Sequence, residues 1–209
     1  MNLSAADRYY LYEMRLESAV TRPGPFANHD RELVDRMAGG DESALGELYV
    51  SHGRRLLAYA FRITRSLDRA EEVVQDSLLA AWRATRTFRG DGTVLAWLLG
   101  IVRNQSLNAI RRKQLRVAAL DEAGTVQATT PRPDARIDAR EREQAIRVAL
   151  ARLSPDHREV LDLVFFHGLS LAEVARVCRC PVGTVKSRLN AAKARLRQAL
   201  GERDAEQQS

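Results

Sequence analysis

Residues 170–189 read SLAEVARVCRCPVGTVKSRL. Ser170 and Glu173 have the spacing of a capping box, in which a serine at the N-cap and a glutamate three residues later each bind the other's backbone N–H group. The short helix that this box starts is expected to bury Leu171, Val174 and Ala175. A four-residue turn at 178–181, Cys-Arg-Cys-Pro, then leads into a long helix from Val182. Two helices joined by a tight turn predict a helix-turn-helix.

The long helix from Val182 has one apolar face and one face of small or polar side chains. Its apolar residues recur at helical spacing and are expected to pack inward; they are Val185, Leu189, Ala192, Leu196 and Ala199. The opposite face carries Gly183, Ser187, Asn190 and Ala194, flanked by Thr184, Lys186, Arg188, Lys193, Arg195 and Arg197. Small residues with a basic rim let a helix enter the major groove of DNA while the rim meets phosphates.

The charge of this part of the chain also favours DNA as a partner. Residues 145–200 contain ten Lys or Arg and four Asp or Glu, a net charge of +6 that equals the net charge of the whole chain. The alternative is an ordinary three- or four-helix bundle with solvated basic faces. The capping box, the turn and the small-faced basic helix together favour DNA binding over that alternative.

Helical periodicity dominates the rest of the chain, and no β-hairpin signal appears. Asp41 is a good N-cap for a helix that carries Ala44, Leu45, Leu48 and Tyr49. Ser154-Pro155 places a capping hydroxyl and a proline at the start of another helix, which stops at Gly168. Further helices are predicted at about 30–38, 52–65, 68–86 and 93–116.

These elements predict an all-α fold of two small helical domains, 30–113 and 140–200, the second one containing the helix-turn-helix. Residues 114–139 have no sustained apolar period and contain Gly124, Pro131 and Pro133, so a flexible linker is expected there. Residues 1–29 are expected to be a flexible extension, and 201–209 a frayed polar tail.

The composition places the chain among globular proteins of the cytoplasm. It has 209 residues, of which 45% are hydrophobic and 29% charged. The first twenty residues lack the apolar segment of a secretory signal, and the longest apolar run, 94–102, is far shorter than the roughly 20 residues that span a bilayer. Cys178 and Cys180 lack the further Cys or His pair of a zinc site, so we expect no metal or cofactor and a Cys178 buried beside Val174.

An acidic segment, DRAEEVVQD at 68–76, opens an amphipathic helix that continues through Trp82. Acidic side chains in a first turn suit the helix dipole, and this accounts for Asp68, Glu71 and Glu72. It explains Asp76 less well, because that residue lies past the first turn. A protein-binding face is the functional alternative.

The helix from Thr93 has a second face with binding character. Its buried face comprises Leu95, Leu98, Leu99, Val102, Ala109 and Ile110. The opposite stripe comprises Trp97, Ile101, Asn104, Asn108 and Arg111, with Arg103 and Arg112 nearby, and the polar loop 88–92 precedes it. An aromatic ring, amides and arginines on one stripe can stack on bases and hold phosphates. For Trp97 by itself, a place in the core is the alternative.

Three segments in this order resemble the extracytoplasmic-function (ECF) group of bacterial RNA polymerase sigma factors: DRAEEVVQD at 68–76, AWLLGIVRN at 96–104 and PVGTVKSRL at 181–189. The resemblance covers residues 31–200. It implies that 31–113 and 145–200 correspond to the family's second and fourth conserved regions, with the third replaced by the linker. It further implies a non-enzymatic protein that binds core polymerase, directs it to promoters, assists melting of the minus-ten element and is controlled by an anti-sigma factor.

The resemblance also implies a role for each group of residues. Contacts to the polymerase, at its β′ clamp helices and β flap, would involve Asp68, Glu71, Glu72, Gln75, Asp76 and Leu79. Capture of the minus-ten element would involve Phe88, Arg89, Gly90, Asp91, Trp97, Arg103, Asn104, Asn108, Arg111 and Arg112. Recognition of the minus-thirty-five element would involve Arg179, Thr184, Lys186, Ser187, Arg188, Asn190 and Lys193.

The chain departs from the family in the turn, where Cys178-Arg179 replaces the usual Leu-Gly. A left-handed Arg179 would cost roughly 1 kcal/mol relative to glycine. Two other functions fit the sequence less well. A regulator that binds duplex DNA without polymerase has no use for the acidic segment or the Trp97 stripe. A recombinase-like enzyme needs a nucleophilic Ser or Tyr with an arginine cluster, or a carboxylate triad for a metal, and neither is evident.

Overall fold

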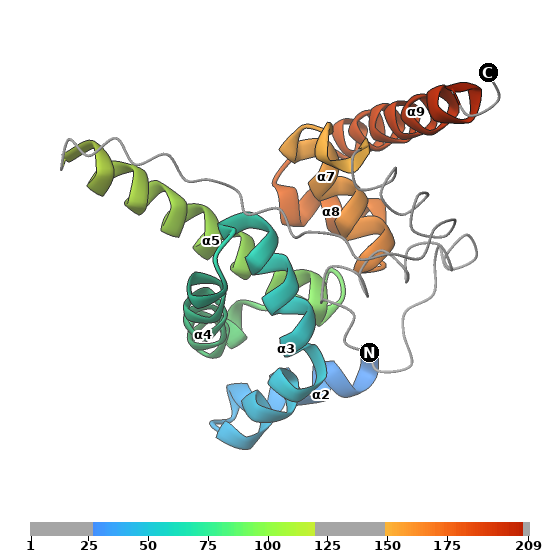
Figure 1. Cartoon of the computed structure of the whole chain (residues 1–209). Helices are drawn as coiled ribbons and strands as arrows, with labels where there is room; N and C mark the ends of the chain where they lie inside the picture. The colour runs from blue at the N-terminus through green and yellow to red at the C-terminus, as the bar shows by residue number, and fades with distance from the viewer. Residues whose placement is uncertain (1–26, 120–148, 207–209) are drawn as a thin grey trace, which may run out of the picture. The chain divides into compact units, whose positions relative to one another are not determined.

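The computed structural model of the chain describes residues 27–119 and 149–206. These residues are helical and include no strand, which confirms the all-α prediction. They divide between two compact units. The N-terminal unit contains the helices labelled α2 to α5, and the C-terminal unit contains α7, most of α8 and α9 (Figure 1).

The N-terminal unit is built around α3. Its elements are α2 (Ala27–Ala38), α3 (Glu42–Thr64), α4 (Leu67–Ala84), the short 3-10 helix η1 (Thr85–Thr87) and α5 (Val94–Ala119). Helix α3 contacts α2, α4 and α5, and α4 also packs on α5. The largest fully buried side chains at these contacts are Leu33, Leu48, Leu56, Tyr59, Leu98, Leu99 and Val102.

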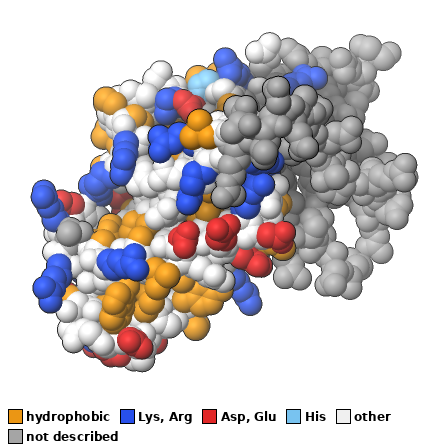
Figure 2. All heavy atoms as spheres, turned by 90° about the vertical axis from the view of Figure 1, so that its left-hand side faces the viewer, with side chains coloured by type: hydrophobic (Ala, Val, Ile, Leu, Met, Phe, Trp, Pro, Cys, Tyr) orange, Lys and Arg blue, Asp and Glu red, His pale blue; other side chains and the backbone are white. Residues whose placement is uncertain are grey.

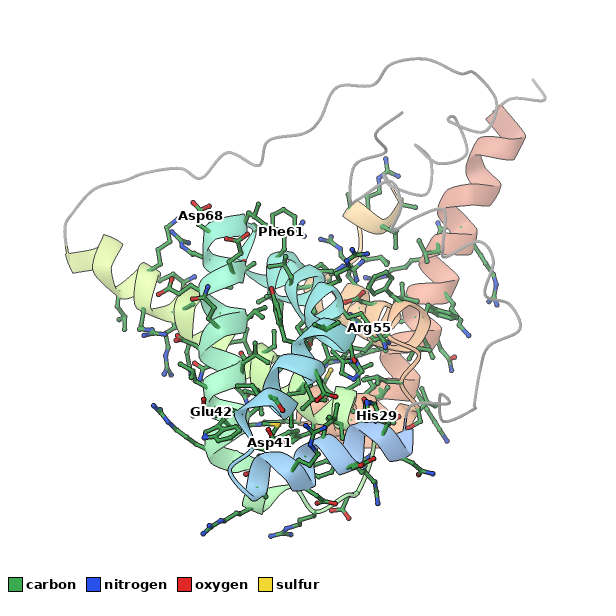
Figure 3. The ribbon with its side chains drawn as sticks, turned by 90° about the horizontal axis from the view of Figure 1, so that it is seen from below. His29, Asp41, Glu42, Arg55, Phe61 and Asp68 are labelled. Atoms are coloured by element: carbon green, nitrogen blue, oxygen red, sulfur yellow. The ribbon has the colours of Figure 1, made fainter. Side chains whose placement is uncertain are left out.

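Helix α3 begins as the sequence predicts. Gly40 takes a positive φ of 93°, and the side chain of Asp41 then accepts a hydrogen bond from the backbone N–H of Ser43, with 3.0 Å between N and Oδ1. The hydrogen bond from the Ser43 hydroxyl, followed by that from Arg36, lowers the pKa of Asp41 to about 2. Asp41 and Glu42 mark this start in Figure 3.

The prediction of two separate helices over 42–65 was wrong, because α3 runs without a break through Gly53. A Cβ atom at Gly53 would lie only 2.7 Å from a ring carbon of Tyr49, so the missing side chain lets that ring lie flat against the helix. The buried His52 also ties α3 to α2, with its Nε2 3.0 Å from Oδ2 of the buried Asp30. These contacts favour helix where the isolated glycine, at a cost of about 1 kcal/mol, suggests a break.

The C-terminal unit comprises α7 (Pro155–Leu161), the π-helical turn η2 (Asp162–Phe166), α8 (Leu171–Cys178) and α9 (Val182–Glu206). Helix α7 contacts α9 and runs directly into η2. The predicted start of α7 is confirmed, since the Ser154 hydroxyl accepts a hydrogen bond from the backbone N–H of His157. The chain turns at Gly168, whose φ is 66°. Buried side chains of this unit include Leu150, Leu153, Val160, Leu163, Val174, Val185 and Ala192.

The helix-turn-helix forms as its capping box predicts. The backbone N–H of Glu173 donates to the Ser170 hydroxyl over 3.3 Å, and the backbone N–H of Ser170 donates to the Glu173 carboxylate over 2.9 Å. Val174, Ala175 and Cys178 are buried, whereas Leu171 is only half-buried. Arg179 has a φ of 52°, so the turn does place a non-glycine residue in the left-handed region.

Two helix ends lie beyond their predicted positions. Helix α5 continues to Ala119, so the first six residues of the expected linker, 114–119, are helical. Helix α9 continues to Glu206, so most of the expected frayed tail is helical as well. Both extensions are rich in Arg, Gln, Glu, Leu and Ala, which are strong helix formers. Residues 27–29, expected to belong to a flexible extension, are helical because α2 begins at Ala27. The rest of that extension, 1–26, and the rest of the linker, 120–139, lie outside the described residues.

Candidate functional site

Helix α4 presents an acidic face to solvent. Ala70, Val73, Val74, Ser77 and Ala81 are buried on its other side. The six residues expected to bind a protein are all exposed and recur at helical spacing: Asp68, Glu71, Glu72, Gln75, Asp76 and Leu79. We call this surface the acidic ridge. Figure 2 views the molecule from the side on which α4 lies in Figure 1, and it shows acidic side chains gathered in a row.

The acidic ridge is available to an external partner. Within the part of the chain that the structure describes, its four carboxylates have no salt-bridge partner. Two leucines on α4, Leu67 and Leu79, are 53% and 52% exposed. Phe61 is also exposed, and it lies with Asp68 at the end of the unit remote from Asp41 (Figure 3). Apolar side chains beside carboxylates that lack internal partners are typical of a protein-binding surface.

A second surface lies on α5 and the loop before it. Thr93 caps α5, because its hydroxyl accepts a hydrogen bond from the backbone N–H of Ala96 over 3.2 Å. The rings of Phe88 and Trp97 pack with their centroids 5.1 Å apart and their planes at 45°. Both rings are half-buried. Trp97 is therefore neither a fully buried core residue nor a free platform, and one side of the aromatic pair remains accessible.

The loop at 88–92 is held in place from α2. The guanidinium of Arg31 donates a hydrogen bond to the backbone carbonyl of Gly90. Gly90 has a φ of 73°, and a Cβ atom there would lie 3.0 Å from the Arg31 guanidinium nitrogen, so glycine is favoured at this position. Sequence reasoning identified Gly90 but missed Arg31, because the two residues are 59 positions apart and no local pattern links them.

The exposed stripe of α5 continues from this aromatic pair. We call Trp97, Ile101, Asn104, Asn108 and Arg111 the α5 face. Asn104 is half-buried, whereas Asn108 and Arg111 are exposed and joined by a hydrogen bond of 3.4 Å. Arg112 is exposed and Arg103 half-buried. On the opposite side Leu95, Leu98, Leu99 and Val102 are buried as predicted, while Ala109 and Ile110 are half-buried.

The third surface is on α9. Its exposed residues, which we call the α9 face, are Gly183, Lys186, Ser187, Asn190 and Ala194. Val185, Leu189 and Ala192 are buried on the other side, as the periodicity predicts. A Cβ atom at Gly183 would meet nothing within 4 Å, so this stretch of α9 is open to a partner. Arg179 in the turn is exposed as well.

Three flanking basic residues of α9 have partners within the C-terminal unit. Arg188 forms an ion pair with Asp156. Arg195 lies with its Nη1 3.1 Å from Nδ1 of His157. Lys193 lies with its Nζ 5.4 Å from the centre of the Phe165 ring, in cation–π geometry. Their partners on α7 and η2 were missed by sequence reasoning, because each lies 28 or more positions away along the chain.

Other chemistry is not indicated in the described ranges. Cys178 is buried and Cys180 half-buried, and neither forms a disulfide. Residues 27–119 and 149–206 contain no group of His, Cys, Asp and Glu side chains that could hold a metal ion. Among the same residues, every helix is too short or too polar to cross a bilayer.

Comparisons with known proteins agree with this arrangement. The family model of sigma-70 region 2 matches residues 48–116, and that of sigma-70 region 4 matches residues 143–196. The chain is 34% identical over 184 residues to the ECF RNA polymerase sigma factor SigM of Mycobacterium tuberculosis, covering 88% of this chain and 90% of that protein. It is 35% identical over 173 residues to SigL from the same species, covering 81% and 96%.

Two solved structures with a similar fold are complexes with a second protein. The sigma factor RpoE, bound to the anti-sigma factor NepR from Bartonella quintana, matches with a TM-score of 0.59 and 30% identity, covering 75% of this chain and 96% of that one. CnrH, bound to the cytosolic domain of CnrY, matches with a TM-score of 0.57 and 28% identity, covering 83% and 97%.

Proposed function

Because the chain belongs to the ECF family of RNA polymerase sigma factors, which initiate transcription and are not enzymes, we propose that its three exposed faces divide the work of initiation. The observation that carries this proposal is the coexistence, in one chain, of an acidic ridge that forms no salt bridge with any described residue and two faces with basic residues on separate helices. A plain duplex-binding regulator needs only one of the three.

The acidic ridge is the proposed polymerase contact. Its carboxylates suit a basic surface such as we expect on the clamp helices of the β′ subunit, and Leu79 adds an apolar contact. Charged groups around an apolar centre favour rapid and oriented association. We assign the polymerase-binding domain to residues 30–113, and we place a second contact, to the β flap, on the domain of residues 140–200.

The α5 face and the loop at 88–92 are the proposed site for the minus-ten element. Extruding a base from the duplex costs a few kcal/mol, and an aromatic surface with amide groups can offset this by stacking and hydrogen bonding. Phe88, Trp97 and Asn104 supply those groups side by side. The remaining basic residues would hold phosphates and so keep the register: Arg89, Arg103, Arg111 and Arg112.

The α9 face is the proposed reader of the minus-thirty-five element. Gly183, Ser187 and Ala194 are small and exposed, so they allow close approach to the floor of the major groove. Lys186 and Asn190 carry the hydrogen-bonding groups that distinguish base pairs there. Thr184 and Arg179 lie where the groove walls and their phosphates would pass.

We also propose that an anti-sigma factor inhibits this chain by covering one or more of the same faces. One structural neighbour, RpoE of Bartonella quintana, is a sigma factor in complex with the anti-sigma factor NepR, and a second, CnrH, is in complex with the cytosolic domain of CnrY. We expect such a partner for this chain in the cytoplasm, where it would cover the acidic ridge or the DNA faces. Co-purification of the tagged chain from its own cells, followed by addition of the captured protein to a transcription assay, tests this. Captured proteins that leave transcription unchanged would contradict it.

Run-off transcription with purified core polymerase is the test of the proposal as a whole. We expect promoter-dependent transcripts only when the chain is added, and only weak DNA binding by the chain alone. The matched control is the double variant Glu72→Lys and Asp76→Lys, which should yield no transcript. Tight, sequence-specific binding by the chain alone without any transcript would instead identify a plain regulator.

A further inference from the structure

The basic residues of α9 fall into two sets that the sequence does not separate. Lys186 is exposed on the α9 face. Arg188, two residues later, points to the other flank of the helix and pairs with Asp156 near the start of α7. The Arg188 side chain is 27% exposed and the Asp156 side chain 54% exposed, so the pair lies at the surface and not in the core.

Asp156 is presented to Arg188 by a rigid element. It follows Pro155 at the first position of α7 and lies within the turn capped by Ser154. The neighbouring His157 contacts Arg195, which lies on the same flank of α9 as Arg188, two helical turns further on. The first turn of α7 therefore engages both arginines on that flank.

The Asp156 carboxylate lowers the net positive charge that this part of α9 presents to DNA. A guanidinium that is paired with a carboxylate presents almost no net charge to a phosphate. A phosphate that approaches Arg188 also meets the negative charge of Asp156, which is more than half exposed. At Arg188 the helix therefore presents almost no net charge to DNA, whereas Arg195 on the same flank contacts a histidine and keeps its charge. Lys186 forms no salt bridge with any of the described residues.

We propose that Asp156 limits sequence-independent binding to DNA, because it withholds Arg188 from DNA phosphates and leaves recognition to the base contacts of the α9 face. This inference rests on the proposed function, because it requires α9 to face DNA. Attraction to phosphates strengthens binding to any sequence equally. Cancelling one surface charge therefore weakens binding to every sequence alike and leaves the choice of sequence to the base contacts, so that the chain spends less time on the large excess of non-promoter DNA.

The salt dependence of binding to non-promoter DNA gives a direct measure of this effect. Each phosphate contact adds about 0.9 to the slope of log affinity against log salt. Asp156→Asn frees Arg188, so we expect the slope for the full chain on a mixed-sequence duplex to steepen by about one. Affinity for that duplex should rise about threefold to tenfold at low salt.

The design uses variants that separate charge from structure. Asp156→Glu restores the carboxylate and should keep the wild-type slope. The double variant Asp156→Asn with Arg188→Gln removes the freed cation and should return the slope to the wild-type value. Asp35→Asn, an exposed position on α2 outside the three faces, is the matched control for loss of one negative charge and should leave the slope unchanged. Circular dichroism establishes that each variant is folded, and Asp156→Ser replaces Asp156→Asn if the latter is not.

The outcomes distinguish failure of this inference from failure of the proposed function. An unchanged or shallower slope for Asp156→Asn, alongside weakened binding by Lys186→Gln, would overturn the role of Asp156 and leave α9 as the DNA-binding helix. If Lys186→Gln also leaves duplex binding unchanged, α9 does not face DNA, and both proposals fall together. A steeper slope that the double variant fails to reverse would also overturn the inference, because the freed charge would then not be that of Arg188.

Discussion

Helices α5 and α9 have nearly the same length, 26 and 25 residues, and each buries an apolar side against its own unit. Their exposed faces differ in shape. The α5 face begins with the bulky Trp97 and Ile101, whereas the α9 face begins with Gly183 and Ser187. A small face can enter the groove of paired DNA, and an aromatic face can stack on bases that have left the duplex. Side-chain volume, more than charge, separates the two proposed tasks.

The neighbours of the two helices differ as well. Next to α5 lies a loop that Arg31 holds from α2, so an aromatic pair is fixed beside the helix. Next to α9 lies the first turn of α7, which engages arginines of the helix itself. The first arrangement places an aromatic pair beside α5, whereas the second gives Arg188 of α9 a carboxylate partner and Arg195 a histidine neighbour.

The largest loss of function is expected from a change on α4 that weakens binding to core polymerase, because neither α5 nor α9 is then brought to the promoter. Reversing charge at Glu72 and Asp76 to lysine should weaken association with core polymerase by at least about 100-fold, because like charges then face each other at the interface. Association of labelled chain with core enzyme measures this. Reversal at Asp35, exposed on α2 outside the acidic ridge, is the control and should have little effect. Equal loss for both changes would mean that net charge, and not the ridge, drives binding.

A bulky residue on the α9 face should prevent that face from entering the major groove, because the face then resembles the bulky α5 face. Ser187→Trp places a large ring where the helix is expected to touch the groove floor, and Ser187 is exposed, so the fold should persist. Run-off transcription is expected to fall about 10-fold to 100-fold through lost base contacts. Ser187→Ala keeps the face small and should lose much less. Normal transcription by the tryptophan variant would place the groove contact elsewhere.

Removing an amide from α5 should have a smaller effect, confined to strand opening. Asn104→Ala is expected to reduce open complexes about 10-fold, because the extruded base loses one of its contacts. Reactivity of unpaired thymines to permanganate at the promoter measures opening. Gln105→Ala, one position away and off the α5 face, is the matched control. A defect in the control as large as that of Asn104→Ala would argue against a specific pocket.

The smallest expected effect is on the pH dependence of stability, and it follows from a difference between the caps of α3 and α7. Helix α3 is capped by a carboxylate, and hydrogen bonds from Ser43 and then Arg36 lower the pKa of Asp41 to about 2. Helix α7 is capped by the Ser154 hydroxyl, which does not titrate in this range. The ionised Asp41 thus stabilises the fold above its ordinary pKa of 3.8, and this contribution is lost as pH falls towards 2.

Urea unfolding of wild type and Asp41→Asn between pH 5 and pH 2 tests this contribution. The asparagine still caps but does not ionise. The urea concentration at the midpoint of unfolding should be higher for wild type than for Asp41→Asn near pH 5, and this difference should shrink towards pH 2. An advantage that stays constant with pH would show that ionisation of Asp41 does not matter.

Local rules predicted the starts and turns of this fold because each rests on residues close in sequence. The Ser170–Glu173 capping box and the Asp41 cap are of this kind. The continuous α3 was missed because a glycine indicates a break unless the Tyr49 ring is seen to cover it. The contacts that shape the proposed sites join residues far apart: Arg31 with Gly90, and Asp156 with Arg188. No spacing rule links such pairs, so the exposed faces were predictable while their internal partners were not.

We propose that α5 binds unpaired DNA and that α9 binds paired DNA. Holoenzyme reconstituted with wild type, Asn104→Ala or Lys186→Ala can be titrated with a single-stranded oligonucleotide carrying the minus-ten element and, separately, with a duplex carrying only the minus-thirty-five element. We predict that Asn104→Ala weakens only single-strand binding and that Lys186→Ala weakens only duplex binding. Losses of equal size on both DNAs for either variant would contradict the division between the two helices.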